Sequence, residues 1–305
     1  RIIYNGYEAY TESDSGDWYM GQSPRSNIEG QNEDMRTYIG HRKDGNEVED
    51  LYIDGKGMIR HTALFGSSGY GRSCLLRNIL IQTAYNGYGF SYIDPKGDDS
   101  KLLIQQLPEN RMDDVILLQP DSEEQFNLTD AIEADKIIIL DTSGINAKLT
   151  RQLVTERFVS EVWTTIKTSD RSADNEDYHL LCIDDFEKVL TDEFGLNEII
   201  SIARSYGLSV VLSGQHPSQL PENVQTGIKQ VQNILSFNLS GNPRDPQVVS
   251  GFIDEINSWD IPELDKFEVT GRIYMDGDRS EPVVFDVYGE YPMLRNTKEA
   301  NQHLD

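Results

Sequence analysis

From about residue 58 onward, short apolar runs alternate with glycine or aspartate turns and with longer segments in which apolar residues recur at helical spacing. Apolar runs of this length are typical of buried strands, and their alternation with helices is typical of a mostly parallel sheet. The expected strands are residues 61–65, 89–93, 115–118, 136–140, 179–183, 208–212 and 234–238. The pattern therefore predicts an α/β fold with a mostly parallel central sheet.

Further helices and strands are expected from weaker patterns of apolar residues. Residues 150–167 are expected to form a long helix, because apolar side chains recur there every three or four positions, and residues 168–177 are expected to form an acidic, solvated loop. After residue 240 the pattern predicts a short helix at 247–256 and strands at 270–275 and 282–287.

Both ends of the chain differ in composition from this middle part. Residues 1–57 are polar and rich in turns, with candidate strands at 36–39 and 48–53, and we interpret them as a small β-type lead-in. The main domain is expected to span residues 58–289, followed by a C-terminal tail or linker at 290–305.

The chain begins at Arg1 rather than at a methionine, so we expect it to be part of a longer protein, with a membrane tether as one interpretation of the missing segment. The sequence itself has no run of about 18 apolar residues, which predicts a cytoplasmic domain. Cys74 and Cys182 lie in apolar stretches and are expected to be buried free thiols.

Acidic residues outnumber basic ones, with 52 Asp and Glu against 27 Lys and Arg and a formal net charge of -25. The carboxylates are spread over every loop, a pattern that indicates solubility in concentrated salt, as in halophiles. Such a field repels phosphate, so any contact with DNA must be local. No basic patch with interleaved aromatic residues stands out, and Lys148, Arg151 and Lys229 are isolated candidates.

The strongest local motif is a glycine-rich segment between the first strand of the main domain and an apolar helix. Backbone N–H groups of such a loop converge on a β-phosphate, the helix N-terminus adds positive potential, and the final Ser ligates Mg²⁺. The expected nucleotide-binding residues are Gly66, Ser67, Ser68, Gly69, Tyr70, Gly71, Arg72 and Ser73, with Ser73 also a Mg²⁺ ligand. The alternative is a tight glycine turn without a ligand.

One position of this motif departs from the usual P-loop pattern. Arg72 stands where the pattern has lysine. A guanidinium is broader and forked, so it can hold phosphates without following their charge into the transition state as a compact ammonium does. ATP binding remains the expectation, and whether ATP is hydrolysed stays open.

Hydrolysis also needs a second Mg²⁺ anchor and a base, usually two acids that close an apolar strand. Strand 179–183 ends in Asp184-Asp185, whereas strand 136–140 ends in Asp141. We assign Asp184 to Mg²⁺ and Asp185 to orienting or deprotonating the attacking water. Glutamate is usual at the second position, and the shorter aspartate falls short by roughly 1.5 Å. The alternative is a helix N-cap followed by a first-turn acid.

A neutral amide follows another strand at the same expected edge of the sheet. Strand 208–212 ends in Ser213-Gly214-Gln215, and ligands of open α/β sheets bind at the carboxyl ends of the strands. Gln215 is a candidate sensor of the γ-phosphate or of the attacking water. An ordinary loop amide is the alternative.

Together these motifs resemble the HerA/FtsK superfamily of P-loop ATPases, close to the HerA and conjugative coupling-protein groups. The resemblance covers about residues 37–290 and implies a RecA-like, additional-strand P-loop NTPase fold with residues 58–289 as the ATPase domain. Combined with the acidic composition, it favours a haloarchaeal source. The segments that carry it are Ile59-Arg60-His61-Thr62-Ala63-Leu64, Tyr92-Ile93-Asp94-Pro95-Lys96-Gly97-Asp98, Asp184-Asp185-Phe186, Ile202-Ala203-Arg204-Ser205-Tyr206-Gly207-Leu208, Ser213-Gly214-Gln215 and Gln219-Leu220.

The resemblance also implies how such a domain works. Motors of this group form homohexameric rings around DNA and bind ATP and Mg²⁺ at subunit boundaries, where an arginine of the neighbour completes the site. Arg204 matches the arginine of the group's Ala-Arg-x-Tyr-Gly-Leu motif and is the candidate finger in trans. The alternative is a surface arginine that pairs with an acid.

Three classes of function follow. The first is an ATP-driven DNA translocase, for conjugative transfer or HerA-like DNA pumping, with Asp185, Arg204 and Gln215 as catalytic residues. The second is a degenerate subunit that binds nucleotide with little or no hydrolysis and acts structurally or as a regulator, which the departures at Arg72 and Asp185 motivate. A metabolic kinase ranks last, because no acceptor lid with basic clamps is visible in the sequence.

Overall fold

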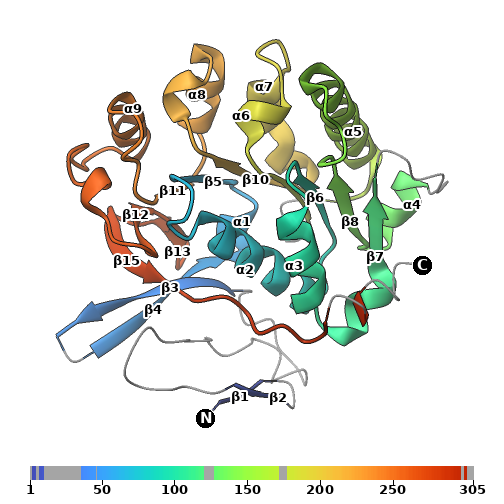
Figure 1. The fold of residues 1–305 in the computed structure, drawn as a ribbon, viewed down its shortest axis with the longest axis horizontal. Coiled ribbons are helices and arrows are strands. Elements are labelled where there is room, and N and C mark those ends of the chain that lie inside the picture. The colour runs from blue at the N-terminus through green and yellow to red at the C-terminus, as the bar shows by residue number, and fades with distance from the viewer. Residues whose placement is uncertain are drawn as a thin grey trace.

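A wide central sheet organises the computed structural model, which describes residues 2–4, 7–9, 36–45, 47–119, 127–171, 177–296 and 299–300 (Figure 1). The sheet has eleven strands in the order β4-β3-β15-β12-β11-β5-β10-β9-β6-β8-β7. In that order the strands span Glu47–Asp54, Arg36–Asp44, Val283–Val287, Glu268–Arg272, Asn233–Ser236, Thr62–Phe65, Leu208–Gly214, His179–Ile183, Phe90–Asp94, Ile137–Asp141 and Val115–Leu118. A separate hairpin joins β1 (Ile2–Tyr4) to β2 (Tyr7–Ala9).

The seven strands from β11 to β7 pair in parallel. The other four, β12, β15, β3 and β4, continue the sheet in antiparallel fashion. The prediction of an α/β fold with a mostly parallel sheet is therefore confirmed. All seven strands expected from the apolar runs are present, with ends displaced by at most two residues.

The two strands of the polar lead-in, β3 and β4, form a hairpin that extends this sheet beyond β15. The first half of β4 is exposed and its second half buried, which explains why its apolar run is short in the sequence. Gly40 lies where β3 meets β15, because a Cβ there would collide with the Asp286 carbonyl oxygen and the Phe285 ring.

The single strand expected at residues 270–275 is wrong in one respect, because the chain leaves the sheet at Ile273. The backbone N–H of Tyr274 donates to the Asn233 side-chain oxygen at 2.7 Å. The following residues form a small hairpin of β13 (Tyr274–Met275) and β14 (Asp278–Arg279).

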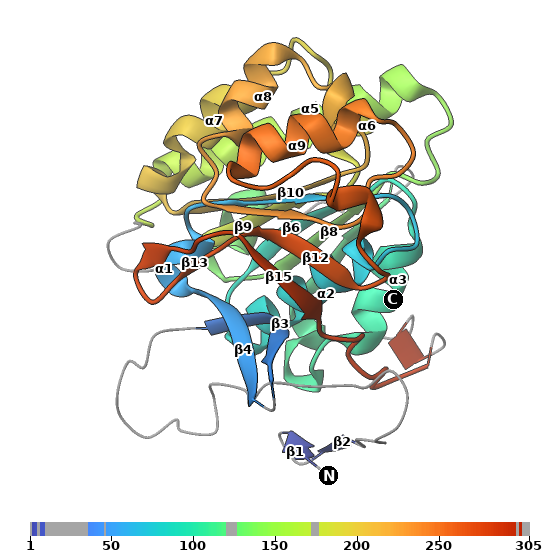
Figure 2. The ribbon, with the colours of Figure 1, turned by 90° about the vertical axis from the view of Figure 1, so that its left-hand side faces the viewer.

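Helices cover both faces of the sheet, as two perpendicular views show (Figures 1 and 2). One face carries α4 (Leu128–Glu133), α5 (Lys148–Thr168), α6 (Phe186–Val189), α7 (Leu196–Ile202), α8 (Glu222–Ile228) and α9 (Arg244–Ile253). The other carries α1 (Gly55–Met58), α2 (Arg72–Tyr85) and α3 (Asp98–Gln106). None of the helices in the described segments is long and apolar enough to span a membrane.

Each strand of the sheet centre contributes to two hydrophobic cores. In β9, Leu181 and Ile183 pack towards α5, whereas Leu180 and Cys182 pack towards α2 and α3. Burial on both faces explains the unbroken apolar runs in the sequence. Cys74 and Cys182 are buried free thiols, as expected, and burial, with Glu290 nearby, raises the pKa of the Cys74 thiol to about 12.

The described part of the C-terminal segment lies along α2 and α3 (Figure 1). The side chain of Asn78 on α2 donates to the Tyr288 carbonyl at 3.2 Å, and Gln106 on α3 donates to the Tyr291 carbonyl at 2.6 Å. Arg295 is buried and donates to the Ile104 carbonyl at 2.6 Å. These contacts hold the segment on the helical face that begins at the glycine-rich loop.

Candidate nucleotide-binding site

The glycine-rich loop lies at the carboxyl edge of the parallel strands, between β5 and α2. The N–H of Gly66 donates to the Gly214 carbonyl at the end of β10 at 3.2 Å, and the N–H of Ser67 donates to the Asn238 carbonyl after β11 at 2.8 Å. Because β5, β10 and β9 are parallel neighbours, the acids that follow β9 and the amide that follows β10 reach the same edge.

Two glycines of the loop have backbone conformations that disfavour other residues, with φ of +89° at Gly69 and +113° at Gly71. Gly71 precedes the first residue of α2, and no side chain caps the helix there. A Cβ at Gly71 would lie 2.6 Å from the Phe267 ring, whereas a Cβ at Gly69 would meet nothing within 4 Å. The loop therefore leaves its N–H groups available to an anion at the start of α2.

Replacing Gly71 with alanine is expected to destabilise the protein by about 2 kcal/mol, because the substitution adds a collision with Phe267 to an unfavourable φ. Gly69→Ala is the matched control, since it carries the backbone strain alone and is expected to cost about half as much. Urea unfolding of both variants measures the difference. Equal losses would show that the contact with Phe267 contributes nothing.

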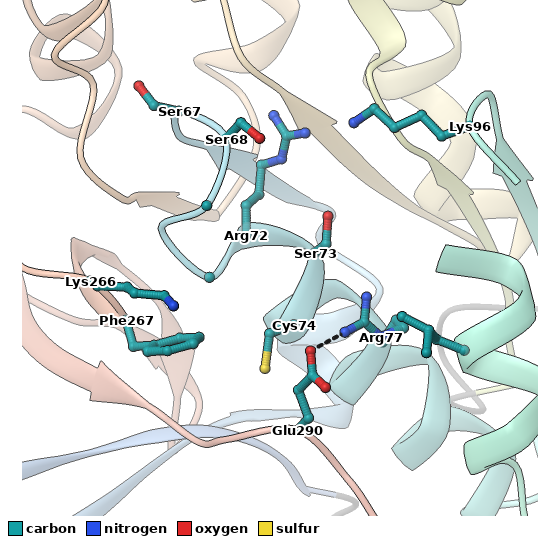
Figure 3. A pocket seen from close by; sticks show the side chains of 13 residues that line it. Ser67, Ser68, Arg72, Ser73, Cys74, Arg77, Lys96, Lys266, Phe267 and Glu290 are labelled. Carbon is teal, nitrogen blue, oxygen red and sulfur yellow. Dashed lines mark hydrogen bonds and ion pairs between the residues drawn. The ribbon is translucent and has the colours of Figure 1, made fainter. Parts of the chain in front are cut away.

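A pocket of about 290 Å³ opens over this loop and along α2 (Figure 3). Ser67, Ser68 and Ser73 of the loop line it, together with Phe267 and Glu290. Its size lies near the lower end of the range for small-molecule sites. The geometry thus joins the glycine-rich loop to a cleft of ligand size.

The side chain of Arg72 is 5% exposed, and carboxylates of the protein itself neutralise its positive charge. Its Nη2 lies 2.7 Å from Asp185 Oδ1 and 3.5 Å from Asp184 Oδ1, and its Nη1 donates to the Gly66 carbonyl at 3.3 Å. The charge of the arginine at the lysine position is therefore directed at the acidic pair that follows β9.

Asp184 is fully buried, and only one of its two carboxylate oxygens has a hydrogen-bond partner among the described residues. Its Oδ1 accepts the Ser213 hydroxyl at 2.7 Å, while Oδ2 has no hydrogen-bond partner among the described residues. Burial raises the pKa of this carboxyl group, and the nearby Arg72 opposes the rise. A buried carboxylate oxygen without a hydrogen-bond partner has the chemistry that a hard divalent cation prefers, and Asp184 follows β9 at the sheet edge that also carries the glycine-rich loop with Ser73.

Asp185 has a positive φ of 45° and both of its oxygens are occupied. Oδ1 lies 2.7 Å from Arg72 Nη2 and accepts the Gln215 side-chain amide at 2.8 Å, and Oδ2 lies 2.9 Å from Lys96 Nζ and 3.0 Å from Lys188 Nζ. Burial by itself raises the pKa of Asp185, but Arg72 and Lys96 outweigh it and hold that pKa well below its usual range. This carboxylate is a weak base and a strong anchor for cations.

Glu187 is a third acid at this edge, and reasoning from the sequence missed it. Its Oε1 accepts the Gln215 backbone N–H at 2.8 Å, and its Oε2 is buried without a hydrogen-bond partner in the described part of the chain. Burial raises the pKa of Glu187. A Cβ at Gly214 would lie 2.8 Å from Oε2, so glycine there makes room for the carboxylate.

Lys96, Lys188 and Ser213 were also absent from the predicted site. Lys96 had a visible signal, because it belongs to the Asp94-Pro95-Lys96-Gly97-Asp98 segment that follows β6. Its loop is held by Asp94, whose oxygens accept the N–H of Lys96 at 2.9 Å and that of Ser100 at 2.7 Å. The sequence offered no comparable signal for Lys188.

Arg204 lies away from the other predicted site residues. It belongs to a short 3-10 helix (Ala203–Tyr206) that precedes β10, so it lies at the amino edge of the sheet, and its side chain is exposed. It does not contact the phosphate loop of its own chain. Asp141, the other strand-end acid, is the last residue of β8, which three strands separate from β5. Its oxygens accept the Ser143 N–H and the Gln119 amide.

Comparison with protein families identifies the chain. The family model of the helicase HerA central domain matches residues 37–204, which is more than half of the sequence. The chain belongs to the HerA central-domain family. The resemblance seen in the motifs is thereby confirmed, and this HerA-family domain includes the phosphate loop and the acidic pair within the matched region.

A stretch of 86 residues, 27% of this chain, is 34% identical to the type 4 coupling protein DotL of Legionella pneumophila and spans only 11% of that protein's length. Among solved structures, the conjugative coupling protein TrwB is similar with a TM-score of 0.59 at 12% identity, over 81% of this chain and 89% of that one. The genome packaging NTPase B204 of Sulfolobus turreted icosahedral virus 2 follows with a TM-score of 0.50 at 15% identity, over 75% and 97%.

At these identities the structural matches establish the fold of the HerA-family domain, which is the RecA-like P-loop fold of TrwB. Solved complexes of TrwB contain a GTP analogue in one case and ADP with Mg²⁺ in another. In this chain, the glycine loop, the open oxygen of Asp184 and the pocket occupy one edge of that fold.

Proposed function

We propose that this HerA-family domain binds ATP with Mg²⁺ and hydrolyses it to move DNA. The observation that carries the proposal is the buried Asp184, whose open carboxylate oxygen lies at the same sheet edge as the glycine loop and Gln215. The ATPase domain in this proposal comprises residues 58–289, with the hairpin of β3 and β4 at the edge of its sheet.

The residues of the site have different roles in the proposed phosphoryl transfer. Backbone N–H groups of residues 68–73 hold the β-phosphate, since those of Gly66 and Ser67 donate to carbonyls at the ends of the neighbouring strands. Ser73 and Asp184 would hold Mg²⁺, which would neutralise charge on the phosphates. Gln215 and Asp185 orient the attacking water. The weak basicity of Asp185 suits orientation better than proton removal, and Glu187, with its raised pKa and open oxygen, is the stronger proton acceptor at this edge.

Arg204 acts on a neighbouring subunit in this proposal. Its exposed position at the amino edge rules out contact with its own phosphate loop but suits a finger presented to the next copy in a homohexameric ring. Ile202 and Tyr206 beside it are 41% and 39% exposed, and their apolar surface suits a protein contact. An arginine supplied in trans stabilises charge on the transferred phosphoryl group.

DNA is the proposed substrate of movement, because the similar proteins include a conjugative coupling protein and a genome packaging NTPase. The net charge of -25 confines DNA contact to local surfaces and favours activity in concentrated salt, as in a halophile. We place the domain in the cytoplasm, with any membrane tether outside the present segment.

ATP hydrolysis with and without DNA tests the proposal, in KCl from dilute buffer to molar concentration, with the assembly state followed by light scattering. We expect DNA-stimulated turnover and a ring in the salt range where the protein is folded. Binding of ATP without turnover in any salt would contradict it and favour a structural or regulatory nucleotide-binding subunit. The neutralised guanidinium of Arg72 is the observation that favours this second function.

A further inference from the structure

We propose that Lys96 supplies to the terminal phosphate of ATP the ammonium charge that a lysine of the phosphate loop usually provides. The inference rests on the proposed binding of ATP at this loop. It assigns the nucleotide's terminal phosphate to the space between the loop and the segment after β6, where Lys96 lies opposite Arg72 (Figure 3).

Arg72 is poorly placed for this task, although it occupies the lysine position. Its side chain is 5% exposed, and its guanidinium contacts Asp185, Asp184 and the Gly66 carbonyl. Turning it towards a phosphate would leave two buried carboxylates without their main counter-charge, which is a costly change. The arginine therefore holds the acidic pair in position and contributes little free charge to the pocket.

Lys96, unlike Arg72, is partly exposed at the pocket. Its side chain is 43% exposed and lines the pocket, and among the residues that the structure describes its Nζ has one ionic partner, Asp185 Oδ2 at 2.9 Å. The backbone beneath it is fixed by the bond from its N–H to Asp94 and by Gly97 at φ +76°. Burial lowers the pKa of Lys96, but the carboxylate of Asp185 more than compensates, so the group carries its charge at neutral pH. A charged, flexible side chain on a fixed base suits phosphate capture.

Asp185 can release Lys96 without becoming unpaired. Its Oδ2 also lies 3.0 Å from Lys188 Nζ, and its Oδ1 keeps Arg72 and Gln215. When Lys96 turns towards a phosphate, Lys188 remains as the counter-charge on the same carboxylate oxygen. This redundancy gives the second lysine a physical role and makes the exchange inexpensive.

Lys188 is also the matched control. It shares the partner atom of Lys96 and has nearly the same exposure, 45% against 43%, but it lies on α6 and is not among the described residues that line the pocket. The experiment compares Lys96→Met with Lys188→Met in the whole chain. Binding of ADP and of a non-hydrolysable ATP analogue, both with Mg²⁺, is measured by titration calorimetry, with circular dichroism to verify folding.

We expect Lys96→Met to weaken binding of the ATP analogue by about tenfold, the usual effect of losing a charge-assisted hydrogen bond, while affinity for ADP changes by less than about twofold. Lys188→Met should leave the affinity for ADP within about twofold and should weaken binding of the ATP analogue by less than Lys96→Met does, because Asp185 Oδ2 then has no second lysine when Lys96 turns away. Lys96→Arg should restore most of the loss. An unchanged preference for the ATP analogue in Lys96→Met, or an equal loss in Lys188→Met, would overturn the proposal. If the wild-type chain bound neither nucleotide, the proposed function would fail first, before any variant is compared.

Discussion

Replacing Asp184 with asparagine is expected to reduce ATP turnover by about 100-fold or more, while binding of ATP in the absence of Mg²⁺ stays within about twofold. Ser213 fixes one oxygen of Asp184, and the other is buried without a hydrogen-bond partner among the described residues. Asparagine preserves the shape of the side chain but removes the negative charge that a divalent cation needs. Steady-state ATPase assays and calorimetry with and without Mg²⁺ measure the two effects.

Asp141→Asn is the matched control for this prediction. Asp141 is also a buried acid, 4% exposed, at the end of a parallel strand, but its oxygens accept the Ser143 N–H at 2.9 Å and the Gln119 amide at 3.1 Å. Its replacement is expected to cost about 1 kcal/mol of stability with little change in turnover per folded molecule. Wild-type turnover in Asp184→Asn, or an equal loss of turnover in both variants, would remove Asp184 from the proposed metal site.

Replacing Asp185 with asparagine is expected to destabilise the fold by about 3 kcal/mol at neutral pH, because the buried Arg72 loses its closest counter-charge. The native pKa of Asp185 is depressed, so its stabilising contribution is complete above the ordinary value of about 4 and is lost as the pH falls towards the native value. The difference in free energy of unfolding between wild type and variant should therefore be constant from pH 7 to about 5 and should shrink below about pH 4. Urea unfolding across this range measures it.

Glu161→Gln provides the comparison for an exposed ion pair. Glu161 lies 2.8 Å from Arg157 on α5, with both side chains more than half exposed. Its loss is expected to cost at most about 0.5 kcal/mol. If the loss of unfolding free energy in Asp185→Asn stayed the same down to low pH, packing rather than the ionised carboxylate would account for the destabilisation.

Reasoning from the sequence succeeded where the determinants were close together in the chain. The apolar run of β9 is contiguous, so the strand and the position of Asp184 at its carboxyl end could be assigned. The role of Asp184 as a metal ligand stays a prediction. The choice of Asp184 over Asp141 agrees with the strand order, which places β9 two positions from β5 and β8 four positions away. The break after Ile273 was missed, because it depends on a bond from Tyr274 to Asn233 across 41 positions of the chain.

The sequence by itself determined the elements, the phosphate loop and the kinds of side chain at the sheet edge, since strand periodicity and turn chemistry depend on neighbouring residues. Only the tertiary structure decided which of those side chains contact one another. It joins Asp185 to Arg72, 113 positions earlier, and to Lys96 after β6, because pairing of distant strands brings their carboxyl ends to one edge. It also exposes Lys96 to the pocket and buries Arg72, a difference of environment that local sequence does not encode.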